Sequence, residues 1–102
     1  MVDTDIIVVV EKNTKSTMRR PSKFHVVFYN DDVTTVEFVI DVLMKIFHKT
    51  FDDAQTLCIE IHENGKGIAG TYGLEIATQK REETIILARM SGFPLRCEVE
   101  EV

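Results

Sequence analysis

The side chains best suited to chemistry in this sequence are three consecutive polar residues, Asn30, Asp31 and Asp32, and a later histidine, His62. Carboxylate and amide oxygens and a neutral imidazole nitrogen accept hydrogen bonds, and an ammonium group has three donors to offer them. This set can therefore bind a cationic amine. An apolar group attached to that amine would supply most of the binding free energy, at about 25 cal/mol per Å² buried.

Two other interpretations of these residues stay open. Asn and Asp favour turns because their short side chains hydrogen-bond nearby backbone, so the run could be only a turn. Asp31, Asp32 and His62 are also residue types that bind divalent metal ions. The histidine near the acidic run, His25, is expected to be a structural strand residue, and no nucleophile with a paired base accompanies these residues. We therefore expect neither a metal site nor a catalytic residue.

Composition indicates one small soluble domain. The chain has 102 residues, 44% of them hydrophobic and 28% charged, with a net charge of −5. An acidic protein is poorly suited to neutralise phosphates, which argues against nucleic-acid binding. No apolar run approaches the ~20 residues of a membrane span and no secretory signal is recognisable, so we expect a cytoplasmic protein. Cys58 and Cys97 have no metal-ligand spacing and are expected to be buried free thiols.

The pattern of apolar residues predicts an α+β fold, a small three-stranded antiparallel sheet packed against three helices. Residues 1–22 are expected to form a mobile extension, in which the β-prone run Ile6–Val10 could add a strand to a sheet edge. The folded domain is expected at 23–102. Its predicted elements are a strand at 24–29, helices at 34–48 and 50–65, a strand at 66–73, a helix at 74–91 and a strand at 95–100.

Capping residues predict where the first two helices begin. Thr34 followed by Glu37 has the form of a capping box, and Thr50 followed by Asp53 repeats the pattern. The first helix has an apolar arc about twice the usual width of ~100°, so it must cover more than the sheet. If the two helices pack side by side, His62 faces the acidic turn across an apolar pocket. The wall of that pocket would comprise Val36, Val39, Cys58 and Ile61.

The sequence resembles the ClpS adaptor family in three stretches: YNDDVTTVEFVIDVL, IHENGKGIAG and PLRCEVE. Members of this family recognise the N-terminal residue of a substrate and deliver it to a Clp unfoldase–protease. The resemblance spans about 22–101 and is specific because the Asn-Asp-Asp turn and the later histidine occur together. It implies a monomeric adaptor without cofactor or enzymatic activity. Its ligands would be substrate N-terminal peptides beginning with Phe, Tyr, Trp or Leu.

The resemblance also implies roles for individual residues. The α-amino group of the substrate would be bound by Asn30, Asp32 and His62, with Asp31 in the same acidic motif. The partner contacted by Glu75 and Lys80 would be the N-terminal domain of a ClpA-type or ClpC-type unfoldase. Residues 1–22 correspond to the segment used in substrate delivery. The hydrophobic pocket positions correspond to Tyr29, Thr34, Val36, Val39, Cys58, Ile61 and Leu95.

Departures from the family pattern cluster at this pocket. The family usually has Tyr-Thr-Pro-Met after the acidic motif, whereas this chain has Val-Thr-Thr-Val at 33–36. Val36 is shorter and stiffer than methionine, and Cys58 replaces another methionine. Tyr29 replaces a smaller aliphatic residue. We expect more tolerance of large or β-branched N-terminal side chains. The alternative is a paralogous Clp-binding regulatory domain that recognises no N-terminal residue.

Overall fold

The computed structural model describes Val8–Val10, Thr17–Arg19 and residues 22–102. Strands β1 (Val8–Val10) and β2 (Thr17–Arg19) pair with each other in an antiparallel sheet of their own. The described part of the predicted Ile/Val strand therefore pairs within the N-terminal segment and not with the larger sheet. The rest of the predicted extension lies outside the described residues.

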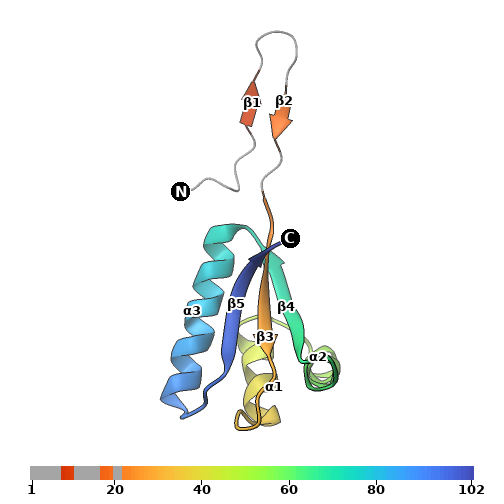
Figure 1. The fold of residues 1–102 in the computed structure, drawn as a ribbon, viewed down its shortest axis with the longest axis vertical. Helices are drawn as coiled ribbons and strands as arrows, with labels where there is room; N and C mark the ends of the chain where they lie inside the picture. Colours follow the sequence, from red (N-terminus) through yellow and green to blue (C-terminus); the bar gives the residue numbers. More distant parts are fainter. Residues whose placement is uncertain (1–7, 11–16, 20–21) are drawn as a thin grey trace.

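The body of the molecule has the element order that the sequence pattern predicts (Figure 1). Strand β3 is central in the antiparallel sheet order β4-β3-β5. Helix α3 runs alongside β5, and α1 and α2 cover the same sheet at its lower end in this view (Figure 1). The elements are β3 (Phe24–Tyr29), α1 (Val36–Lys45), α2 (Phe51–Asn64), β4 (Lys66–Tyr72), α3 (Leu74–Met90) and β5 (Arg96–Glu101).

The core lies between the sheet and the helices. Val26 and Phe28 of β3 are fully buried, and Leu43 of α1 packs in the same cluster. The buried residues of helix α3 are all small, which lets it approach the sheet closely, and Ile85 packs against the core as a partly buried residue. The buried residues of α3 are Ala77, Thr84 and Ala88.

The first helix begins one residue later and ends earlier than the sequence indicates. Thr35, not Thr34, is the N-cap of α1, since its hydroxyl accepts a hydrogen bond from the Phe38 amide at 3.2 Å. Thr34 is unavailable for this role because it is bonded to Asp31 in the preceding turn. The helix ends at Lys45 instead of the predicted 48. The backbone of His48 has a positive φ of 57° and is no longer helical. The second helix begins as predicted, with the Thr50 hydroxyl accepting from the Asp53 amide.

Two glycines bring α2 against β4. Gly65 ends α2 in a left-handed conformation, with φ 88°. Gly67 lies so close to the helix that an added Cβ would be 2.8 Å from Ile61 Cγ1 and 3.0 Å from Leu57 Cδ1. This glycine-rich strand therefore lies in close contact with α2 at Ile61.

Candidate functional site

The acidic turn and the end of α2 are joined through the backbone. The amide of Asn30 donates to the carbonyl of Gly65 at 2.9 Å. Since His62 lies less than one helical turn before Gly65, this bond brings the histidine and the turn to the same place. The structure thus confirms the expected side-by-side packing of the first two helices, and α1 and α2 are in contact.

Asp31 organises the turn. One carboxylate oxygen accepts from the amides of Val33 and Thr34 at 2.8 and 2.7 Å, and the other accepts from the Thr34 hydroxyl at 2.8 Å. Partial burial by itself raises the pKa of this carboxyl. Hydrogen bonds from Thr34 and Val33 and the positive charge of Arg89 outweigh that effect, so the pKa of Asp31 lies below its usual value.

The neighbouring polar side chains have unused acceptors. Among the residues that the structure describes, no hydrogen bond involves the side chains of Asn30, Asp32 or His62. All three are exposed. Asn30 and His62 border the cavity described next, while Asp32 lies outside its lining. An amine at this edge of the cavity would therefore meet an amide oxygen and an imidazole nitrogen that need not give up other partners.

The cavity itself has a volume of about 140 Å³. A smaller one of about 30 Å³ continues from it, since both are bordered by Asn30, Asp31, Thr34, Val39 and Ile61. The larger cavity is completed by Val36, Cys58 and His62, and the inner one by Phe28, Tyr29 and Leu95. Together they form one cleft with a polar rim and an apolar inner end.

The cysteines differ from the expectation of two buried thiols. Cys97 is fully buried in the core, and burial raises the pKa of its thiol to about 12. Cys58 is only half-buried and borders the cavity, where partial burial raises its pKa as well. The side chain at 58 therefore presents a neutral, polarizable surface to the cavity.

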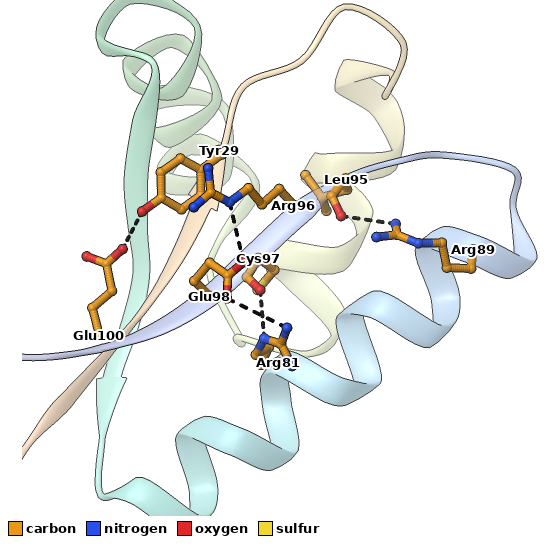
Figure 2. Close-up of polar contacts among 8 residues, drawn as sticks. All are labelled: Tyr29, Arg81, Arg89, Leu95, Arg96, Cys97, Glu98 and Glu100. Carbon is orange, nitrogen blue, oxygen red and sulfur yellow. Dashed lines mark hydrogen bonds and ion pairs between the residues drawn. The ribbon is translucent and has the colours of Figure 1, made fainter.

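Tyr29 borders the inner cavity, but its ring makes other contacts (Figure 2). The hydroxyl donates to a Glu100 carboxylate oxygen, and that hydrogen bond raises the pKa of the phenol. The guanidinium carbon of Arg96 lies 4.0 Å from the ring centroid. Because Phe28 faces the core, the next side chain along β3 points to the opposite face of the sheet.

The two residues that the resemblance assigns to unfoldase binding have different environments. Glu75 is exposed in the first turn of α3. Lys80 is half-buried, and its ammonium donates to the Ile46 carbonyl at 2.7 Å. The same ammonium lies 5.8 Å from the Phe47 ring centroid and 5.4 Å from that of Tyr72. Lys80 thus links α3 to the end of α1.

Arg89 is a residue near the site that the sequence did not single out. Its Nη1 donates to the carbonyls of Phe93 and Leu95 at 2.9 and 3.0 Å. Its charge also contributes to the lowered pKa of Asp31. The one available signal was a single charged residue within the apolar stretch at 85–90.

Two negative findings apply to the described part of the chain. Within it, no group of three or more His, Cys, Asp or Glu side chains could hold a metal ion. Within residues 8–10, 17–19 and 22–102, no helix is both long enough and apolar enough to cross a membrane.

Comparison with known proteins places this geometry in a family. The family model described as "ATP-dependent Clp protease adaptor protein ClpS" matches residues 19–98. A relative with that function in its name, from Lawsonia intracellularis, is 47% identical over 85 residues, which are 83% of this chain and 78% of the relative. Another from Campylobacter jejuni is 45% identical over 84 residues, covering 82% of this chain and 88% of the relative.

A solved structure supports the same assignment. Agrobacterium tumefaciens ClpS2, bound to L-phenylalaninamide, superimposes with a TM-score of 0.79 and 31% sequence identity. The match covers 81% of this chain and all of that one, 100%. By sequence and by fold, this chain belongs to the ClpS family of ATP-dependent Clp protease adaptors.

Proposed function

We propose that this protein binds substrates through a bulky hydrophobic N-terminal residue and its free α-amino group. The observation that supports this most directly is the cleft itself, in which an apolar cavity of about 140 Å³ opens beside Asn30 and His62. A single side chain suits a cavity of this size, since pockets for drug-sized ligands are usually about 300 Å³ or more. The related Agrobacterium protein binds L-phenylalaninamide, which has a free α-amine next to a benzyl group.

The α-ammonium would donate to the Asn30 side-chain oxygen and to a ring nitrogen of neutral His62. Asp32 would add attraction through its charge from outside the cavity lining. Asp31 would act indirectly, because its oxygens are already used by the turn. The hydrophobic side chain would contact Thr34, Val36, Val39, Cys58 and Ile61, with Leu95 at the inner end.

We further propose that the bound substrate is delivered to the N-terminal domain of a ClpA-type or ClpC-type unfoldase. Exposed Glu75 would contact that domain, and residues 1–22 would assist delivery. In this role the protein is a cytoplasmic, monomeric adaptor that needs no cofactor and catalyses no reaction.

The side chains of the outer cavity favour a broad choice of N-terminal residues. Val36 and Cys58 border the cavity where longer, flexible side chains would fill more of it. Peptides beginning with Ile should therefore bind with an affinity within about tenfold of those beginning with Leu. Titration of matched peptides beginning with Phe, Trp, Leu and Ile tests this, and an Ile peptide far below the others would contradict it.

Variants of the acceptor residues test the amine site. His62→Ala removes one charge-assisted hydrogen bond and should weaken binding of a peptide with free N-terminal Phe by roughly tenfold or more. Asp32→Asn should weaken it by a few-fold, and less at high salt. Asp41→Asn is the matched control, since Asp41 is an exposed acid of α1 that pairs with Lys45. Equal affinities in all three variants would contradict the proposed amine site, and no binding even by the wild-type protein would favour a regulatory domain without N-terminal recognition.

A further inference from the structure

Two arginines of α3 bind the carbonyls along one edge of β5 and the loop before it (Figure 2). Arg81 Nε donates to the Cys97 carbonyl at 2.7 Å, and Arg81 also lies 3.7 Å from a Glu98 carboxylate oxygen. Arg89 Nη1 donates to the Phe93 and Leu95 carbonyls. The two side chains thus have similar roles, because they bind carbonyls that are two residues apart on the same edge, those of Cys97 and Leu95.

Only one of them holds a residue that borders the candidate binding cleft. Leu95 is 2% exposed and borders the inner cavity, together with Asn30 and Asp31. Cys97 is buried in the core and borders neither part of the cleft. Arg89 therefore holds the backbone of a cleft residue, whereas Arg81 holds the backbone of a core residue.

The backbone around Leu95 depends on such support. Residues 91–95 connect α3 to β5 without regular structure, and Gly92 has a positive φ of 82°. Backbone hydrogen bonds from Ser91, Gly92 and Phe93 hold the start of this connection to α3. Arg89 donates to two further carbonyls, of Phe93 and Leu95, and so holds its end. The positive charge of Arg89 also acts on Asp31, which borders the inner cavity as Leu95 does.

We propose that Arg89 is a positioning residue that fixes Leu95 as the inner end of the cleft. By doing so it increases the ratio of the affinity for long N-terminal side chains to the affinity for short ones. The proposal rests on the proposed function, in which the N-terminal side chain enters this cleft. A phenyl group extends further from its Cα than an isopropyl group does. Contact with a fixed inner wall therefore benefits Phe more than Val, and a movable wall reduces that benefit.

The test compares Arg89→Met with Arg81→Met. Methionine keeps an apolar stem and removes the donors in both cases. Affinities are measured by fluorescence anisotropy for two peptides that differ only in N-terminal Phe or Val. Arg89→Met should lower the Phe-to-Val affinity ratio by roughly fivefold, and Arg81→Met should change it by less than about twofold. Equal changes in the two variants would overturn the proposal, because both arginines would then be only structural.

A double-mutant cycle asks whether Arg89 acts through Leu95. If it does, adding Arg89→Met to Leu95→Ala should change the Phe-to-Val affinity ratio only slightly beyond the effect of Leu95→Ala alone. Additive effects would contradict the proposal. Should Arg89→Met fail to fold, Leu95→Ala in the wild-type background carries the test, and an unchanged ratio there would overturn it. If the wild-type protein binds neither peptide, the proposed function fails and not this inference alone.

Discussion

At the scale of single residues, adjacent carboxylates of identical charge have different roles. Asp31 accepts three hydrogen bonds from Val33 and Thr34, while Asp32 is exposed and outside the cavity lining. Residue type and spacing predict an acidic turn at this place but do not distinguish the two acids, which only the family resemblance separates. Their difference arises from the path of the backbone after the turn, which brings Thr34 back to Asp31.

Replacement of Asp31 should lower stability in a pH-dependent way. The folded-state pKa of Asp31 is lowered, so its stabilisation is present above the ordinary value of 3.8 and is lost as pH falls through the lower folded-state pKa. Asp31→Asn should cost about 1 kcal/mol in the free energy of unfolding at pH 7. Urea denaturation at pH 7 and pH 3 measures this. A difference between variant and wild type that grows toward pH 3 would contradict the assignment.

Tyr29 should matter little for ligand binding. Its hydroxyl contacts Glu100 and its ring contacts Arg96, so Tyr29→Phe removes a hydrogen bond away from the larger cavity. Affinity for a peptide with N-terminal Phe should stay within about twofold of wild type. Isothermal titration calorimetry with both proteins checks this. A loss of about tenfold or more would mean that the phenol contacts the ligand.

At the scale of elements, the sequence predicts most helices and strands because capping residues and apolar periodicity are local signals. Thr50 and Gly65 bound α2 as expected. The start of α1 was misplaced by one residue because Thr34 and Thr35 are chemically equivalent until the Asp31 turn forms. The link between Lys80 and Ile46 was not predictable, since it joins α3 to a helix end 34 positions away.

Lys80→Met should reduce stability even without any partner. It removes the hydrogen bond to the Ile46 carbonyl and the contacts with the Phe47 and Tyr72 rings, at a cost of about 1–2 kcal/mol. Lys45→Met is the control, because Lys45 is exposed and pairs only with Asp41 across one helical turn. Thermal unfolding of both variants provides the comparison. Equal stability would leave partner contact as the main role of Lys80.

At the scale of the whole molecule, the two ends of β3 have separate roles. The N-terminal segment joins β3 at one end of the sheet, where the Val102 amide donates to the Lys23 carbonyl at 3.0 Å (Figure 1). The acidic turn follows the other end of β3. The element order and the three-stranded sheet were predictable from the sequence. The part of the cavity lining on α1 and α2 was predictable from helix packing, whereas Tyr29, Thr34 and Leu95 were implied only by the family resemblance, because the lining joins side chains from four separate segments.

Removal of residues 1–21 should separate binding from delivery. The described body from residue 22 onward contains the entire cleft, so peptide affinity should stay within about twofold of the full chain. Degradation of a reporter with N-terminal Phe by a Clp unfoldase and its protease should be lost. Anisotropy and a degradation assay on the same preparation measure both. Loss of peptide binding on truncation would show that the N-terminal segment belongs to the binding site.

The central claim is that the cleft recognises a free α-amine attached to a hydrophobic side chain. Fluorescence anisotropy of a labelled peptide with free N-terminal Phe, beside its N-acetylated twin, tests this most directly. Acetylation removes the positive charge and two of the three donors, so binding should fall by roughly a hundredfold or become undetectable. Equal affinity for the two peptides would contradict the claim, and the acidic turn would then have only a structural role.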